Sequence, residues 1–140
     1  MAIIGKNAKD THIHHVNPDQ HSYKDLIVWQ KSIDFSIQVI DLVDSLETDR
    51  KHYRLIEQLE AAATSIPMNI AEGKGRFSKK EYGHFLIIAR GSLYETMTLL
   101  EIFMRKGWIS AESFSAIEMQ SIEISKMITS MHHHLRIHNS

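Results

Sequence analysis

Cysteine is absent from this 140-residue chain, and proline and glycine are scarce, with two and six residues respectively. The absence of cysteine excludes disulfides and thiolate metal sites and is typical of proteins of a reducing cytoplasm. No apolar run is long enough to span a membrane. Residues 1–15 also lack the apolar core of a signal peptide. We therefore expect a protein of a bacterial-type cytoplasm.

An excess of charge of one sign is lacking too. The 16 lysines and arginines stand against 17 acidic residues, which gives a formal net charge of −1. No global basic field therefore attracts nucleic acid to the chain, and any such contact must depend on a local patch. The length fits one domain, and an apolar content of 43% is sufficient for a sizeable core.

The chain does contain apolar residues at spacings of three and four, which is the helical period. We expect a flexible, histidine-containing tail over residues 1–22, a four-helix bundle over 23–135 and a C-terminal tail over 136–140. The terminal histidines are His12, His14, His15, His21, His132, His133, His134 and His138. Such clusters are typical of adventitious Zn²⁺ or Ni²⁺ binding rather than of a functional site.

The first predicted helix runs from Asp25 to about Leu46 and is unusually rich in apolar residues. One stripe along it comprises Leu26, Trp29, Ile33, Ile37, Ile40 and Val43, and this stripe is widened by Val28, Phe35, Val39, Leu42 and Leu46. That width exceeds what one bundle interface needs. Two interpretations stay open: a thoroughly buried helix, or a helix with a second interface for self-association.

Three further stripes follow at helical spacing. They comprise Tyr53, Ile56, Leu59, Ala63, Ile66 and Ile70, then Tyr82, Phe85, Ala89, Leu93, Met97, Leu100 and Met104, and then Phe114, Ile117, Ser121, Ile124, Ile128, Met131 and Leu135. Between them, Ser78 with Glu81 is typical of a capping box, Lys106–Gly107 of a helix stop and Ser110 of an N-cap. Four amphipathic helices with short connections predict an all-α, antiparallel up-down bundle.

The end of the second helix has an unusual composition. Pro67 cannot donate a hydrogen bond to the carbonyl of Ala63, so we expect a kink there. The hydroxyls of Thr64 and Ser65 are expected to lie close to the freed carbonyls. Glu72 stands at the carbonyl end of this helix, where an anion is unfavourable, and is expected to lie near the start of the third helix.

An antiparallel turn directly after this helix predicts a register for the hairpin. Residues 61–63 lie opposite 88–90, and Gly91 lies opposite Glu60. A glycine inside a helix costs about 1 kcal/mol relative to alanine, so we expect close backbone approach at Gly91 to offset it. Arg90 comes within reach of Glu60 or Glu57; the alternative is an Arg90 side chain that points to solvent.

The basic residues around this turn are the first candidate site. Lys74, Arg76, Lys79, Lys80 and Arg90 have only Glu81 as an acidic neighbour between positions 74 and 90. Repeated around an oligomer, this cluster could hold a polyanion such as RNA or DNA. The alternative is a solvated turn. A phosphate loop is not supported, because Gly73-Lys74-Gly75 lacks the required spacing and no strand precedes it.

An acidic face on the first helix is the second candidate site. It comprises Asp34, Asp41, Asp44, Glu47 and Asp49. We expect Asp41, Asp44 and Glu47 to contact a basic protein partner or the basic cluster of a neighbouring subunit.

Metal and catalytic sites find little support. Glu81 and His84 form one E-x-x-H motif, whereas di-iron bundles use two such motifs and two more glutamates. No spacing of serines and histidines indicates a catalytic triad. We expect no metal site, no cofactor and no enzymatic activity.

The segment SIPMNIAEGKGRFSKKEYGHFLIIARGSLYET carries four blocks: S-I-P-x-N-I-A-E-G, R-x-S, E-[YF]-x-x-F-L and A-x-G-S-L-x-E. The residues that match them are Ser65, Ile66, Pro67, Asn69, Ile70, Ala71, Glu72, Gly73, Arg76, Ser78, Glu81, Tyr82, Phe85, Leu86, Ala89, Gly91, Ser92, Leu93 and Glu95. In these blocks the chain resembles the four-helix bundle proteins that are also called 23S rRNA intervening-sequence proteins. The structural motif residues are Pro67, Asn69, Glu72, Gly73, Ser78, Glu81 and Gly91.

The resemblance spans roughly residues 23–131 and implies a bundle that assembles as a homopentamer. A similar branch, the accessory proteins of diversity-generating retroelements, contacts a reverse transcriptase and binds nucleic acid. Family members often carry basic residues before the S-I-P block, where this chain has Glu60-Ala61-Ala62.

The residues and the resemblance together favour a non-enzymatic, homo-oligomeric scaffold. Its partners would be RNA or DNA and a protein such as a reverse transcriptase. The rival interpretation is a protein–protein adaptor that uses the acidic face and binds no nucleic acid. A metal-binding bundle is the minor alternative.

Overall fold

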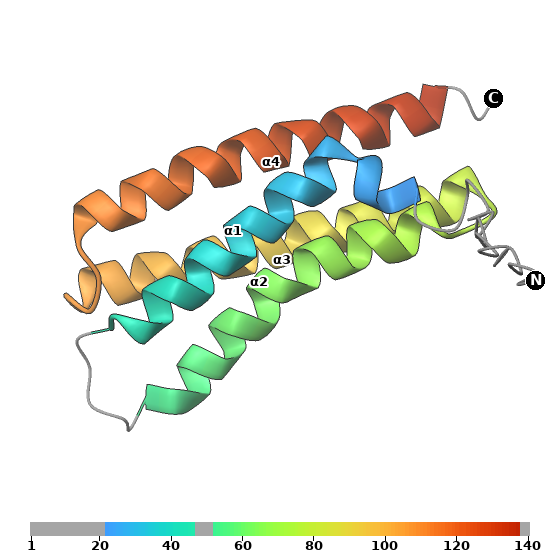
Figure 1. Cartoon of the computed structure of the whole chain (residues 1–140). Coiled ribbons are helices and arrows are strands. Elements are labelled where there is room, and N and C mark those ends of the chain that lie inside the picture. Colours follow the sequence, from blue (N-terminus) through green and yellow to red (C-terminus); the bar gives the residue numbers. More distant parts are fainter. Residues whose placement is uncertain (1–21, 47–51, 138–140) are drawn as a thin grey trace, which may run out of the picture.

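The computed structural model describes residues 22–46 and 52–137, which form a short 3₁₀-helix and four long α-helices. The elements are η1 (Ser22–Asp25), α1 (Ile27–Asp44), α2 (Tyr53–Lys74), α3 (Lys79–Arg105) and α4 (Ala111–Ile137). The long helices alternate in direction, and each packs against two others, in the cyclic order α1, α2, α3, α4 (Figure 1). The predicted all-α, antiparallel up-down four-helix bundle is confirmed.

The boundaries depart little from those predicted. Helix α4 continues to Ile137, two residues beyond the predicted end of the bundle. Most of the two predicted tails, residues 1–21 and 138–140, lies outside the described residues. Within the described ranges, no helix combines the length and the apolar character that crossing a bilayer requires.

The core runs the length of the bundle. Its largest fully buried side chains are Phe35, Phe103, Leu59, Ile66, Ile70, Leu86, Leu93, Leu100, Ile124 and Ile128. All four helices contribute to this cluster. Burial of this apolar surface is the main stabilising contribution to the fold.

The face of α1 that packs into the core is not the main apolar stripe predicted from the sequence. Its buried residues are Val28, Ser32, Phe35, Ser36 and Val39. Ile37 is 51% exposed, and Ile33 and Ile40 are half-buried. The two serines obscure the inner face in the sequence, yet they bury well because their hydroxyls donate to main-chain carbonyls.

The predicted helix ends are confirmed, with one correction. The N–H of Glu81 donates to Oγ of Ser78 at 3.1 Å, and the N–H of Ser113 donates to Oγ of Ser110 at 3.0 Å. Gly107 has a φ of 74°, as the helix stop requires. The capping box is only half formed, because the Glu81 carboxylate accepts from the Ser78 hydroxyl at 3.3 Å rather than from its main-chain N–H.

Pro67 lies inside a continuous α2, whose axis changes direction along its course (Figure 1). The prediction that Thr64 and Ser65 serve the freed carbonyl is wrong. The Ala63 carbonyl accepts from Oγ of Ser36, on α1, at 2.9 Å. Thr64 donates instead to the carbonyl of Glu60 at 2.8 Å. A neighbouring helix therefore satisfies the carbonyl that the proline leaves without a donor.

The predicted α2–α3 register is also wrong. Ser65 and Ser92, not Glu60 and Gly91, lie against each other, with their hydroxyl oxygens 2.8 Å apart. Gly91 is exposed, and a Cβ built on it would meet nothing within 4 Å. Close approach occurs at Gly73, where an added Cβ would lie 2.8 Å from Cβ of Phe85. Counting outward from the turn could not reveal this, because side-chain packing along the seam sets the register.

Candidate nucleic-acid interface at the α2–α3 hairpin

The connection between α2 and α3 is a tight turn. The N–H of Gly75 donates to the carbonyls of Ala71 and Glu72, at 3.2 Å each, and the N–H of Arg76 donates to the carbonyl of Gly73 at 3.1 Å. These bonds close the last turn of α2, and Ser78 caps α3 directly afterwards. The hairpin therefore presents its side chains from a well-defined backbone.

A seam of small and polar residues holds the two helices together behind the turn. Ser65, Asn69 and Gly73 stand at every fourth position of α2. Nδ2 of Asn69 donates to the carbonyl and to Oγ of Ser65, at 2.8 Å each, and Ser65 in turn meets Ser92. Asn69 and Gly73 thus contribute to the packing of α2 against α3. The Glu72 carboxylate, by contrast, has no recorded hydrogen bond or ion pair with the described residues, so its predicted role stays a prediction.

Two cations of the hairpin lie over aromatic rings. Nζ of Lys74 is 5.9 Å from the ring centre of Tyr82, and Cζ of Arg76 is 4.7 Å from that of Phe85. Burial of the Tyr82 ring raises the pKa of its hydroxyl. Because a ring face leaves the hydrogen-bond donors of a cation available, both groups can still bind an anion.

Phe77, at the tip of the turn, is fully exposed. It stands between Arg76 and Lys79 in the sequence. A shallow hollow of 520 Å³ lies at the start of α3. Arg76, Lys80, Glu81, His84 and Phe85 line that hollow. Phe77 was not among the predicted site residues, although an aromatic residue inside a basic run is a signal for nucleic-acid binding.

Four of the five predicted basic residues, Lys74, Arg76, Lys79 and Lys80, gather at the hairpin, and Arg90 does not. Nε of Arg90 donates to the hydroxyl of Tyr94 at 2.8 Å, and Tyr94 also meets Ser125 of α4 at 3.3 Å. The hydrogen bond with Ser125, followed by that with Arg90, lowers the pKa of Tyr94. The side chain of Arg90 is exposed and contacts Tyr94 toward α4, so the pairing with Glu60 or Glu57 does not form.

The candidate acidic face lies partly in the described chain. Asp41 and Asp44 are exposed near the end of α1, far from the α2–α3 hairpin (Figure 1). Asp34 lines a separate hollow between α1 and α4, where Lys31 pairs with Glu123 at 2.7 Å. Glu47 and Asp49 lie outside the described residues.

Metal-ligating residues do not cluster in the described part of the chain. No group of three or more histidine, cysteine, aspartate or glutamate side chains lies close enough to hold an ion there. Glu81 is engaged at the α3 cap, and the ring of His84 packs edge-on against that of Phe85, with centres 6.2 Å apart.

Comparisons with other proteins agree with this fold. The family model described as 23S rRNA-intervening sequence protein matches residues 24–130. The chain is also similar to a solved structure from Bacteroides thetaiotaomicron VPI-5482, a protein with unknown function from the S23 ribosomal protein family. The two share 30% identity and a TM-score of 0.70, over 75% of this chain and 97% of that one. No functionally curated protein matches.

Proposed function

The chain belongs to the 23S rRNA-intervening sequence protein family, and we propose that it is a non-enzymatic, homo-oligomeric scaffold that binds RNA or DNA through its α2–α3 hairpin. The observation that carries the proposal is the arrangement of the hairpin side chains. Lys74 and Arg76 lie over ring faces, and the fully exposed Phe77 stands beside them.

Each part of this arrangement suits a polynucleotide. Cations bind phosphates and contribute most of the affinity in sequence-independent binding. An exposed aromatic ring can stack on an unpaired base of any sequence. Since the net charge of the chain is −1, binding must be local, and repetition of the hairpin around an oligomer would strengthen it.

The test compares two variants that lose the same charge. Lys74→Gln with Arg76→Gln removes two hairpin cations, whereas Arg105→Gln with Lys106→Gln removes two cations at the other end of α3. Fluorescence anisotropy with structured RNA and duplex DNA, from about 50 mM salt upward, measures the affinity. We expect the hairpin variant to bind more weakly, with a salt slope reduced by about 1 for each phosphate that the missing cations would have neutralised.

Two results would contradict the proposal. One is no detectable binding of either nucleic acid by the wild type at low salt. The other is an equal loss of affinity in the two variants, because only the net charge would then matter.

A second role, in binding a basic protein, is favoured by the end of α1. Asp41 and Asp44 are exposed there, near the carbonyl end of the helix where an anion is unfavourable. Residues that break a local rule of stability are often found at functional sites. Charge reversal at both positions would abolish capture of such a partner, for example a reverse transcriptase, and unchanged capture would count against this role.

A further inference from the structure

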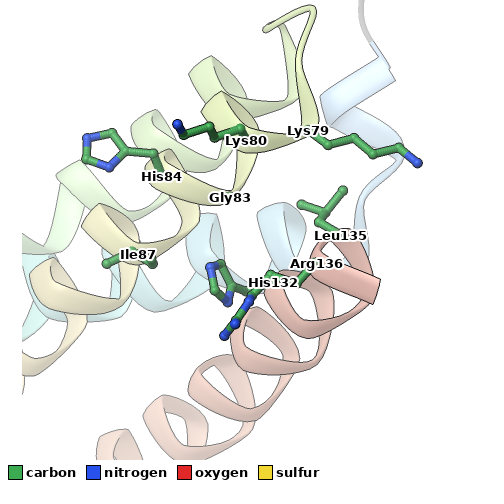
Figure 2. Close-up of a pocket in the computed structure, with 8 residues that line it drawn as sticks. All are labelled: Lys79, Lys80, Gly83, His84, Ile87, His132, Leu135 and Arg136. Carbon is green, nitrogen blue, oxygen red and sulfur yellow. The ribbon is translucent and has the colours of Figure 1, made fainter. Parts of the chain in front are cut away.

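A cleft between the start of α3 and the end of α4 lies next to the hairpin. It has a volume of 290 Å³ and is lined by Lys79, Lys80, Gly83, His84, Ile87, His132, Leu135 and Arg136. Figure 2 shows the imidazole of His132 and the side chains of Ile87 and Leu135 between the two helices. The guanidinium of Arg136 lies beside His132, whereas Lys79 and Lys80 extend from the first turn of α3 toward the outside of the cleft.

The floor of this cleft is apolar and flat. Gly83 is buried, and a Cβ added to it would lie 3.4 Å from Cδ2 of His132. The missing side chain therefore lets the imidazole ring of His132 pack directly against the backbone of α3. Together with Ile87 and Leu135, the ring provides a surface on which another planar ring could stack.

The rim of the cleft is cationic. Lys79, Lys80 and Arg136 contribute positive charge, and none of the described residues that line the cleft carries a carboxylate. Lys79 and Lys80 open α3, where the helix dipole also favours an anion. The dipole at the end of α4 has the opposite sign, and Arg136 offsets it.

A second hollow between the same two helices has the opposite character. It is lined by Tyr94, Met97, Thr98, Glu101, Ile102, Arg105, Phe114 and Glu118. Its two glutamates outnumber its one arginine, and Arg105 is already paired with Glu101 at 3.0 Å. Preference for an anion thus belongs to one end of the α3–α4 groove and not to the groove in general.

We propose that the cleft of Gly83, Ile87, His132 and Arg136 binds a single nucleotide, with its base against the apolar floor and its phosphate at the cationic rim. The volume is close to the lower limit of roughly 300–1,000 Å³ for ligand pockets, which suits one nucleotide better than a larger ligand. The proposal rests on the proposed function, since Lys79 and Lys80 belong to both sites. It adds the substrate class: a nucleic acid with an unpaired base.

The experiment compares a short labelled single-stranded RNA with an abasic strand of the same length and charge. The wild type is expected to bind the intact strand about 5-fold more tightly or better, which is the low end of what one stacked base contributes. Ile87→Glu, which alters the apolar floor, should lower that ratio by about the same factor. Arg136→Gln, which removes a phosphate contact that both strands make, should weaken the binding of both strands. Adenosine monophosphate, added as a competitor, tests whether a free nucleotide fills the cleft.

Matched control variants are available on the same helices. Ile102→Glu alters a half-exposed isoleucine in the second hollow, and Lys126→Gln removes a cation from the middle of α4. Both should keep the wild-type ratio between the intact and the abasic strand. Circular dichroism of all four variants identifies any that fails to fold.

The outcomes separate this inference from the proposed function. A ratio that falls in Ile87→Glu and not in the two control variants supports a strand-borne nucleotide, and full displacement of the strand by adenosine monophosphate supports a free one. If the ratio is the same in the wild type and Ile87→Glu, the inference is overturned, while hairpin binding stands. If neither strand nor the mononucleotide binds, both proposals are overturned.

Discussion

Ser36 has one hydroxyl hydrogen and two nearby acceptors, the carbonyls of Ser32 at 2.8 Å and Ala63 at 2.9 Å. The Ser32 carbonyl already accepts the helical N–H of Ser36, whereas Pro67 leaves the Ala63 carbonyl without a donor. Both Ser36 and Ala63 are buried. Ser36 is therefore the residue that allows a proline inside α2.

We predict that Ser36→Ala destabilises the protein by about 1–3 kcal/mol, the cost of a buried unsatisfied carbonyl. Ser32→Ala is the control. It also removes a buried hydroxyl, but the Val28 carbonyl that this hydroxyl contacts still accepts the helical N–H of residue 32. In a Pro67→Ala background, residue 67 regains an N–H, so Ser36→Ala should cost less there. Urea unfolding of the four members of this cycle measures the coupling, and strictly additive changes would contradict the account.

Gly73 and Gly91 are predicted to respond oppositely to alanine. At Gly73 the new Cβ would clash with Phe85 and Tyr82, so overpacking of about 1–3 kcal/mol should exceed the gain in helix propensity. At Gly91 nothing lies within 4 Å, and alanine should stabilise by up to about 1 kcal/mol. Urea midpoints of the two variants that move in the same direction would show that the packing is misassigned.

The last turn of α1 carries negative charge and no basic residue. Because an anion is unfavourable at a helix C-terminus, Asp44→Lys should stabilise the isolated protein by about 0.3–1 kcal/mol at low salt, and salt should weaken the gain. Thermal unfolding at two salt concentrations measures this. Asp34→Lys, nearer the middle of α1, is the control and should show no such dipole effect. A loss of stability in Asp44→Lys would mean that its carboxylate has a structural partner.

Helix types and helix ends were readable from the sequence because they depend on local signals. Ser78, Gly107 and Ser110 act through their own backbone neighbours, and the structure confirms each of them. The core face of α1 was not readable, since two apolar stripes compete and the buried Ser36 is polar. Its donation to a distant α2 carbonyl leaves no trace in the spacing of residues.

The candidate site was readable to a similar degree. The basic run from Lys74 to Lys80 is continuous in the sequence, so its gathering at one turn was expected. The cleft next to it joins residues about fifty positions apart, such as Gly83 and His132. Only the antiparallel packing of α3 and α4 brings them together. The sequence alone does not predict the register in which these two helices pack.

The molecule exposes more apolar surface on α1 than an isolated bundle needs, with Ile27 60% and Ile37 51% exposed. We predict self-association through this face, into the homopentamer that the family resemblance implies. Light scattering should then give about five times the chain mass of 16.2 kDa. Ile37→Glu should reduce the mass, while Met119→Glu, an exposed apolar residue on α4, should not. A wild type of 16.2 kDa would contradict self-association.

The two ends of the bundle differ in charge. The α2–α3 hairpin presents Lys74, Arg76, Lys79 and Lys80. The other end presents Asp41 and Asp44 together with Arg105 and Lys106, so its charges offset one another. This separation explains how a chain of net charge −1 can still offer a polyanion a basic surface. It also predicts that nucleic acid contacts one end only.

Ultraviolet cross-linking of a single-stranded RNA to the wild-type protein, followed by peptide mapping, tests that claim most directly. Exposed aromatic side chains at the site favour the reaction, and Phe77 is fully exposed. We predict cross-linked peptides from residues 74–87, with a second set from 132–136 if the cleft holds a nucleotide. Cross-links confined to α1 or to the α3–α4 connection, or none at low salt, would contradict the account.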